Sequence, residues 1–298
     1  MSFQDVLSQM ANLVNKELEQ LVPVKENLQR NIYEAMRYSL LAGGKRIRPV
    51  LTLAYAEILN VPGKMVMPFA CALEMIHTYS LIHDDLPAMD NDDMRRGRPT
   101  CHKQFNEALA ILAGDALLNR AFEVMSEACD ALPQEEKARG IKMMLHVAQS
   151  AGTEGMIGGQ VVDLQSEGRE VDETTVRYTY RCKTGALLTA PALVAISAAG
   201  AAESQVADRL LSYTKAIGLA FQIRDDILDI EGDSSVLGKA TGRDEKEEKR
   251  SLAAVKGVPY CKTLLEELTA QAVSDAAYFG EKGIFLKEMA EYLRNRDN

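Results

Sequence analysis

The chain has 298 residues, of which 47% are hydrophobic and 26% charged, and it carries a formal net charge of −9. This length allows a large buried core, and the acidic balance argues against non-specific binding to nucleic acid or to an anionic membrane surface. The five cysteines are an odd number without CxxC spacing. We therefore expect no disulfide framework and no structural zinc, and a reducing, cytoplasmic location.

The N-terminus lacks the basic-then-apolar layout of a signal peptide. No apolar run reaches the roughly 18–20 uncharged residues that a membrane helix needs, so stable membrane insertion is not expected.

The residue pattern is helical almost throughout. Period-2 alternation is nearly absent, while Ala, Leu, Met, Glu and Lys dominate. Asp172 is the expected N-cap of a long helix in which Gly185 and Pro191 are candidate kink positions, and Pro23 is expected to open another helix. The expected helices, in chain order, cover residues 2–21, 23–41, 47–59, 65–85, 104–130, 134–153, 156–166, 172–199, 202–230, 258–279 and 284–294. Without a linker or a composition break, the sequence predicts one all-α domain over residues 1–298.

Carboxylates gather at the ends of two apolar helices. Five of them lie between Asp84 and Asp93, and the segment Asp225-Asp226-Ile227-Leu228-Asp229 closes the second helix. A negative charge at a helix C-terminus is disfavoured by about 0.3–1 kcal/mol, so two such ends indicate a positive species between them. Carboxylates without a partnering His or Cys favour Mg²⁺ or Mn²⁺, which also bind substrate phosphates. The alternative for either cluster alone is a solvated acidic helix end.

The local geometry of the clusters follows from helix periodicity. Asp225 and Asp229 are four residues apart and share a helix face. Pro87 prevents a regular helix through the first cluster, so Asp90 must return by a loop or a distorted turn. His77 lies two turns before Asp84 on the same face, either as a core residue or as a ligand contact.

Basic residues form a second theme. Gly43-Gly44-Lys45-Arg46-Ile47-Arg48-Pro49 places backbone N–H groups and the cations Lys45 and Arg48 at a helix start, which suits a phosphate. Arg95 and Arg96 adjoin the first acidic cluster, Lys183-Thr184 sits inside an apolar helix, and Lys239 follows the second cluster. Each alone is an ordinary surface charge. Together they indicate two anionic groups, one held through metal and one by cations.

These motifs together resemble the trans-prenyl diphosphate synthases, and specifically the bacterial farnesyl diphosphate synthase type. The resemblance covers nearly the whole chain, in the segments Gly43 to Pro49, Ile82 to Gly97, Gly158-Gly159-Gln160-Val161-Val162-Asp163-Leu164, Lys183 to Leu187, and Phe221 to Lys239. It implies an all-α fold around a deep central cavity, a homodimer, and three Mg²⁺ ions per site, with Mn²⁺ as a substitute.

The resemblance also implies roles for individual residues. The implied metal ligands are Asp84, Asp85, Asp90, Asp225 and Asp229, with Asp226 in the same motif in a less direct role. The implied contacts to the allylic substrate are Arg95, Lys183, Thr184, Gln222, Lys239 and Lys249. The implied isopentenyl diphosphate site comprises Gly44, Lys45, Arg48, His77 and Arg96.

The implied reaction is the condensation of isopentenyl diphosphate with dimethylallyl and then geranyl diphosphate. Metals and cations stabilise the leaving diphosphate, the isopentenyl double bond attacks the allylic cation, and a proton is lost. No protein nucleophile is needed. In this family the residues five and four before the first Asp, here Tyr79 and Ser80, influence product length, and Tyr79 lies roughly 7.5 Å below Asp84 along a helix.

Farnesyl diphosphate, a C15 compound, is the product that the resemblance implies, and Tyr79→Ala is expected to lengthen it. A C20 or a C10 synthase remains the nearest alternative, and a non-catalytic partner subunit a remote one. A terpene cyclase does not fit, because the second acidic cluster lacks its Asn/Asp-Asp-x-x-Ser/Thr-x-x-x-Glu pattern. The chain departs from the family at Ser251-Leu252-Ala253, where Thr-Tyr-Pro is usual. Its Arg294-Asn295-Arg296-Asp297 end resembles basic tails that cover the site in some relatives, but helix end-capping is the favoured interpretation of this segment.

Overall fold

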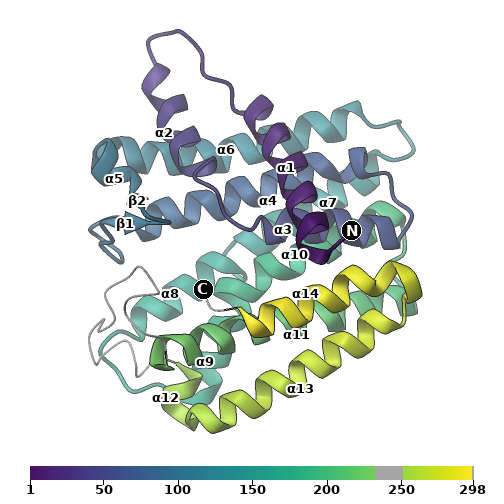
Figure 1. Ribbon diagram of the computed structural model, residues 1–298. Helices are drawn as coiled ribbons and strands as arrows, with labels where there is room; N and C mark the ends of the chain where they lie inside the picture. The colour runs from purple at the N-terminus through teal and green to yellow at the C-terminus, as the bar shows by residue number, and fades with distance from the viewer. Residues whose placement is uncertain (232–250, 297–298) are drawn as a thin grey trace.

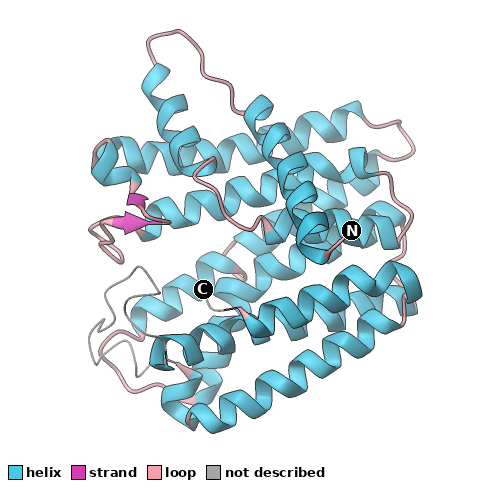
Figure 2. Ribbon diagram, viewed as in Figure 1, coloured by secondary structure: helices cyan, strands magenta, loops and turns pink. Residues whose placement is uncertain are grey.

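The computed structural model describes residues 1–231 and 251–296, and in these ranges the chain is almost entirely helical (Figure 2). The N-terminal helices are α1 (Phe3–Leu21), α2 (Arg30–Leu40), α3 (Ile47–Ile58), α4 (Gly63–Asp84), α5 (Cys101–Gln104), α6 (Glu107–Ala131), α7 (Lys137–Ala151) and α8 (Met156–Gln165). The C-terminal ones are α9 (Glu173–Thr179), the π-helix η1 (Tyr180–Gly185), α10 (Ala186–Ala199), α11 (Gln205–Glu231), α12 (Leu252–Lys256), α13 (Val258–Ala277), the 3-10 helix η3 (Gly280–Gly283) and α14 (Ile284–Asn295). The predicted all-α fold is confirmed.

Three local predictions need correction. Residues 23–29 are not helical, and α2 begins at Arg30 instead of Pro23. The reason lies at the end of α1, where Arg37 of α2 donates hydrogen bonds to Glu19 O at 3.0 Å and Val22 O at 2.7 Å. These bonds satisfy helix-end carbonyls that a directly following helix would leave unpaired.

The long helix predicted over 172–199 is interrupted. Asp172 caps it as expected, accepting a hydrogen bond from Thr175 N at 2.8 Å. The chain then widens into η1 before it continues as α10. A short antiparallel hairpin, β1 (Met94–Arg95) and β2 (Arg98–Pro99), was also not expected. Its turn is made by Arg96 and Gly97, both at positive φ.

Helices α4 and α10 lie inside the bundle, and most of their residues are buried (Figure 1). Helix α4 packs against α3, α6 and α10, and α10 packs in turn against α7 and α11. The stretches Gly63–Asp84 and Glu173–Ala199 are long and apolar enough to cross a membrane, but 72% and 56% of their most apolar windows are buried inside the protein. A core helix passes the same test of length and composition, so the two stretches are explained by the packing of this bundle.

A buried ion pair joins the start of α3 to α4. Arg46 adopts a left-handed conformation with φ of 50° and donates to Glu74 Oε1 at 2.6 Å. Its guanidinium also donates to Asn15 Oδ1 at 2.8 Å and to Leu40 O at 2.6 Å. This pairing fixes the chain between Gly44 and Arg48, and it explains why Arg46 is unavailable to a ligand while its neighbours are not.

Candidate active site

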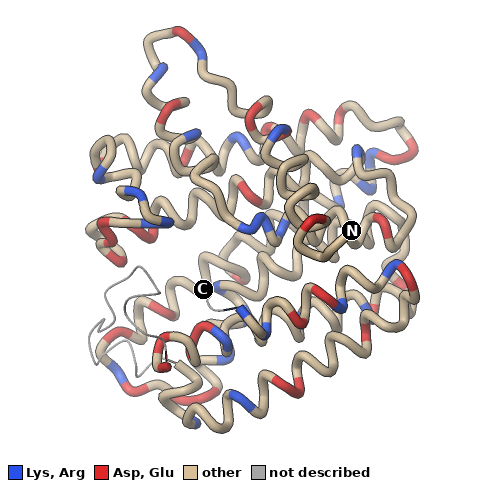
Figure 3. Tube along the Cα trace, in the orientation of Figure 1, with Lys and Arg blue, Asp and Glu red and all other residues tan. Residues whose placement is uncertain are grey.

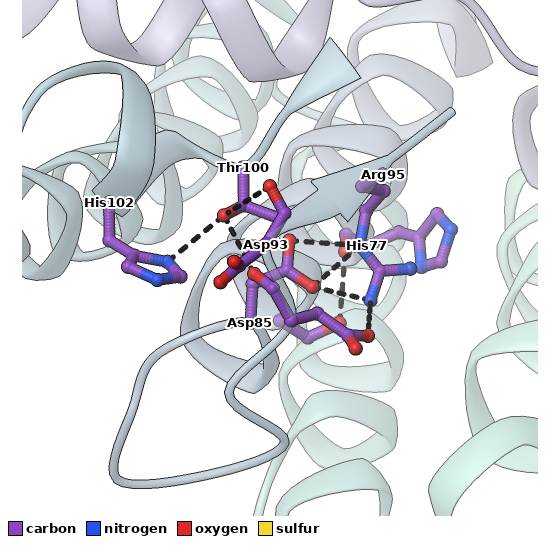
Figure 4. A network of polar contacts seen from close by, with 8 residues as sticks. His77, Asp85, Asp93, Arg95, Thr100 and His102 are labelled. Atoms are coloured by element: carbon purple, nitrogen blue, oxygen red, sulfur yellow. Dashed lines mark hydrogen bonds and ion pairs between the residues drawn. The ribbon is translucent and has the colours of Figure 1, made fainter. Parts of the chain in front are cut away.

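The first acidic cluster lies where α4 ends beside the hairpin, and Figure 3 shows acidic and basic residues together there. As Pro87 predicted, the chain leaves the helix and turns back, so that Asp90 N donates to Asp84 O at 2.8 Å. Arg95 of β1 forms an ion pair and hydrogen bonds with the buried carboxylate of Asp85, at distances of 2.6 to 2.9 Å. Figure 4 shows this pair beside His77. Asp85 is therefore held by an arginine, whereas Asp84 and Asp90 have no such ion pair within residues 1–231 and 251–296.

Asp84 lies in an environment that resists its negative charge. Burial raises the pKa of Asp84 to about 6, an effect that the charge of Lys183 opposes and that of Asp90 reinforces. Burial alone would lower the pKa of Lys183, but Asp163, bonded to its Nζ at 2.6 Å, and then Asp84 and Asp90 raise it. A carboxylate in such surroundings gains from an added cation.

Lys183 and Thr184 lie in the π-helix η1, a form that often marks functional sites. Helix α8 approaches η1 so closely that a Cβ on Gly159 would lie 2.1 Å from Lys183 N. The same helix carries Asp163. The Gly158-Gly159-Gln160-Val161-Val162-Asp163 motif therefore has two functions: Gly159 allows close packing against η1, and Asp163 orients Lys183. The sequence analysis quoted this motif but gave Asp163 no role.

The second acidic cluster connects to the same π-helix. Thr184 donates to Gln222 Oε1 on α11 at 2.8 Å, and the amide of Gln222 lies 3.3 Å from Asp225 Oδ2. Adjacent residues of η1 thus face both clusters, since Lys183 acts on Asp84 and Thr184 reaches Asp225 through Gln222. The charge of Lys183 therefore acts on Asp84, and Thr184, Gln222 and Asp225 form one chain of contacts. The metal and substrate roles of these residues stay predictions.

Arg296, near the C-terminal end of the chain, contacts the second acidic cluster. It forms an ion pair with Asp225 Oδ1, donates to Phe221 O at 2.9 Å, and lies 3.7 Å from the centre of the Phe221 ring. Burial raises the pKa of Asp225 to about 6 even against the positive charge of Arg296. The sequence analysis favoured a simple helix-capping role for this basic segment, which does not describe the observed contact.

Asp226 points into a different environment. Its carboxylate accepts from Tyr180 Oη at 2.6 Å and from Leu252 N at 2.9 Å, in the core formed by α9, η1, α11 and α12. Burial raises the pKa of Asp226 to about 7, although these hydrogen bonds oppose the rise. These contacts give Asp226 a structural function in joining α11 to α12, so we do not count it among the metal ligands proposed below. Ser251, the first residue of the segment that departs from the family pattern, is the N-cap of α12.

The predicted isopentenyl site is a cluster of cations around His77. Burial lowers the pKa of Arg48 to about 10, and its Nε has no hydrogen-bond partner among the described residues. Burial, followed by the charges of Arg48 and Arg96, holds the pKa of His77 well below its usual value, so the imidazole is neutral at pH 7. A buried guanidinium edge without an acceptor is the kind of group that an anion satisfies.

Gly44 serves this cluster through its lack of a side chain. At its φ of +119°, a Cβ would lie 2.8 Å from the guanidinium carbon of Arg96, which also donates to Gly43 O. Lys45 lies on the other side, 5.5 Å from the centre of the Tyr292 ring, and burial lowers its pKa. Lys239 and Lys249 lie outside the described residues.

A cavity of about 330 Å³ is lined by some residues of each predicted substrate site. Arg48, His77, Asp84, Lys183 and Thr184 lie in its polar part, and its apolar part is lined by Tyr79, Met156, Ile157, Val161 and Leu164. Ser80, His83 and Gln160 also line it, and the Gln160 carboxamide has no hydrogen-bond partner among the described residues. A larger cavity of about 920 Å³ between α9, η1, α10 and α11 contains none of the predicted site residues that the structure describes.

The carboxylates fit a metal that a ligand helps to hold. Among residues 1–231 and 251–296, no three His, Cys, Asp or Glu side chains converge to form a complete metal site. Mg²⁺ typically takes only one or two carboxylates together with substrate phosphates, so an incomplete protein shell that includes carboxylates with raised pKa values matches it. Asp84, Asp90, Asp225 and Asp229 are the residues suited to hold it, whereas Asp85, which was also predicted as a ligand, is already paired with Arg95.

The comparison with known proteins gives a family match over most of the chain. The family described as polyprenyl synthetase matches residues 29–279. The chain belongs to the polyprenyl synthetase family. It is 48% identical over 269 residues to the geranylgeranyl diphosphate synthase of Cyanophora paradoxa, covering 90% of this chain and 88% of the relative. It is 42% identical over 300 residues to the heterodimeric geranylgeranyl pyrophosphate synthase large subunit 1 of Arabidopsis thaliana, covering 99% of this chain and 80% of the relative.

The fold agrees as well. The crystal structure of an FPP/GFPP synthase from Zymomonas mobilis superposes with a TM-score of 0.86 at 33% identity, covering 97% of this chain and 98% of the other. This polyprenyl synthetase is therefore a prenyltransferase of the class that joins isopentenyl and allylic diphosphates. The curated relatives favour the C20 product, which the sequence analysis held as an alternative, over the farnesyl product that it preferred.

Proposed function

We propose that Asp84, Asp90, Asp225 and Asp229 bind the diphosphate of an allylic substrate through Mg²⁺, and that Lys183 and Arg95 bind it directly. The observation that supports this proposal is the link from Asp84 through Lys183 and Thr184 to Gln222 and Asp225, which connects the two acidic motifs through adjacent residues of η1. Bound Mg²⁺ would supply charge neutralisation of the leaving diphosphate.

The protein's own residues account for the remaining requirements. The charge of Lys183, whose ammonium donates to Asp163, acts on Asp84, and the carboxamide of Gln222, fixed by Thr184, lies beside Asp225. Arg48 and neutral His77 are suited to hold isopentenyl diphosphate without metal, Arg48 by charge and His77 by one N–H donor. The apolar walls around Tyr79 and Met156 exclude water, which would otherwise trap the allylic cation as an alcohol.

Product length is the finer part of the proposal. The names of the relatives support C20, whereas the buried Tyr79 ring in the cavity wall favours C15, because it lies only about five residues below the metal end of α4. Incubation with isopentenyl and dimethylallyl diphosphates and Mg²⁺, followed by chromatography of the products, decides between them. Absence of any elongated prenyl diphosphate would contradict the proposed function itself.

We also propose that two copies of the chain associate through the neighbouring helices α6, α7 and α8. These helices expose a set of large apolar side chains: Ile111 (45%), Leu112 (56%), Ile141 (56%), Leu145 (43%), Ile157 (42%) and Val161 (46%). Apolar residues gathered at this density on adjacent elements are typical of a protein interface. The mass in solution, measured by light scattering, is expected to be that of a dimer, and a monomer at micromolar concentration would contradict this.

Replacing Arg296 by Gln is expected to tighten the binding of Mn²⁺ to the substrate-free protein about fivefold, because an ion pair worth about 1 kcal/mol no longer competes for Asp225. Titration followed by electron paramagnetic resonance of free Mn²⁺ measures the affinity. Arg294→Gln is the matched control, since Arg294 pairs with Glu266 at 3.0 Å. Equal affinities for the two variants would show that Asp225 does not bind the ion.

A further inference from the structure

The wall of the cavity contains a pair of rings on α4 in edge-to-face contact. Tyr79 and His83 are one helical turn apart, and their ring centres lie 5.7 Å from each other with an interplanar angle of 81°. Both side chains line the cavity, and Tyr79 is only 6% exposed. An edge-to-face contact of this kind orients one ring against the other. The position of Tyr79 therefore depends on the position of His83.

His83 is held from behind by α6. Its Nε2 lies 3.0 Å from Ile111 O. A carbonyl oxygen only accepts, so the imidazole must carry its proton on Nε2 to make this bond. The nearest carboxylate, Asp115 Oδ1, lies 3.9 Å from the same nitrogen. The ring is thus tied to the backbone of α6 and is not free to rotate into the cavity.

Gly114 makes room for this ring. A Cβ added to Gly114 would lie 2.1 Å from His83 Nε2 and 2.5 Å from its Cδ2, distances that real atoms do not allow. Gly114 sits within α6, where glycine costs about 1 kcal/mol relative to alanine. Its absent side chain is the reason that the imidazole can rest against the helix backbone, with α6 on one side and the cavity on the other.

We infer that Gly114 and His83 act as a positioning device for Tyr79 and so set the length at which the product stops growing. This inference rests on the proposed function, because it concerns the cavity in which the product grows. His83 is sandwiched between Gly114 and the cavity, so a methyl group behind it pushes the ring inward, whereas removal of the ring opens the wall. The device predicts opposite effects for the two changes.

Gly114→Ala is expected to shift products toward shorter chains, and His83→Ala toward longer ones. Each should change the ratio of longer to shorter product by roughly tenfold, the selectivity that one methylene commonly produces in an apolar pocket. Products are separated by chromatography after incubation with labelled isopentenyl diphosphate, with dimethylallyl diphosphate as the starter. A general loss of stability would not make the product shorter in one variant and longer in the other, so product length distinguishes positioning from destabilisation.

Gly140→Ala is the matched control. Gly140 is a buried glycine of α7 whose added Cβ would meet Leu132 Cδ1 at 2.7 Å and Cys129 Sγ at 3.0 Å, side chains that do not line the cavity. It is expected to lower the melting temperature without changing the product ratio. If Gly114→Ala fails to fold, His83→Ala alone decides, and an unchanged or shorter product from it overturns the inference.

The possible outcomes distinguish a failure of the proposed function from a failure of the role inferred for Gly114 and His83. A wild-type protein that makes no prenyl diphosphate would contradict the proposed function. A wild-type protein that makes its product normally, with Gly114→Ala giving the wild-type or a longer product, would overturn only the role of Gly114 and His83.

Discussion

Asp84→Asn is expected to reduce prenyltransferase activity by about 10²–10³-fold or more, the loss typical of removing one group that stabilises charge in a transition state. The physical reason is that the amide cannot supply the negative charge that binds Mg²⁺ at the end of α4. Steady-state kinetics at saturating Mg²⁺ measures kcat. Asp93→Asn is the control, since Asp93 is exposed and pairs with Lys103 at 2.9 Å. Similar losses in both variants would contradict a specific metal role for Asp84.

The same variant is expected to be more stable than wild type when metal is absent. A carboxyl whose folded pKa is about 6, above the unfolded value of 3.8, destabilises the folded state at neutral pH. The two-unit rise corresponds to at most about 3 kcal/mol, and solvent screening of this partly buried group reduces the expected gain to about 1 kcal/mol. Melting in EDTA at pH 7.5 should show it.

The stability difference between Asp84→Asn and wild type is expected to depend on pH. The cost of charging Asp84 is fully present above the folded pKa of about 6 and disappears as the pH falls toward 3.8. The melting temperatures of Asp84→Asn and wild type should therefore converge between pH 6 and pH 4. A gain that persists unchanged at pH 4 would mean that Asp84 ionisation does not cause it.

Glu74→Ala is expected to lower the free energy of unfolding by about 3–5 kcal/mol, because it leaves the Arg46 charge buried without its partner. The two side chains are only 1% and 3% exposed, and no water can replace the lost carboxylate easily. Urea denaturation followed by circular dichroism measures the change. Because Arg46 fixes the segment that presents Lys45 and Arg48, the variant should also raise the KM for isopentenyl diphosphate.

Glu34→Ala provides the comparison for this loss. Glu34 pairs with Arg30 at 2.7 Å on the surface of α2, with side chains 38% and 48% exposed. Its removal should cost no more than about 0.5 kcal/mol. If both variants lose the same small amount, the Arg46–Glu74 pair does not hold α3 against α4.

The helices that face the core were predictable from the sequence, because α3, α4, α6 and α11 begin or end within a few residues of the expected positions. Their apolar periodicity is set locally. The turn after Pro87 was predictable for the same reason, since proline excludes a helical hydrogen bond wherever it occurs. By contrast, the π-helix at Tyr180 depends on the approach of α8 through Gly159, a tertiary contact with no local signature.

The candidate site shows the same division. The grouping of acidic and basic residues followed from their motifs, but their partners did not. In the sequence, Arg46 is one more cation beside Lys45 and Arg48. Only the fold shows that its charge is neutralised by Glu74, which lies 28 residues away along the chain. Asp226 looks equivalent to Asp225 in sequence, yet a turn of about 100° between adjacent helical residues directs it toward Tyr180. The Arg296–Asp225 pair joins segments 71 residues apart.

The central claim is that Mg²⁺ and an allylic diphosphate complete the site between Asp84 and Asp225 together. The most direct test is the melting temperature of the protein with a non-cleavable allylic diphosphate analogue, measured with and without Mg²⁺. At 100 times its dissociation constant, a ligand that binds only the folded state adds about 2.7 kcal/mol to the free energy of unfolding. The account predicts that this shift requires both components. An equal shift from the analogue in EDTA would contradict it.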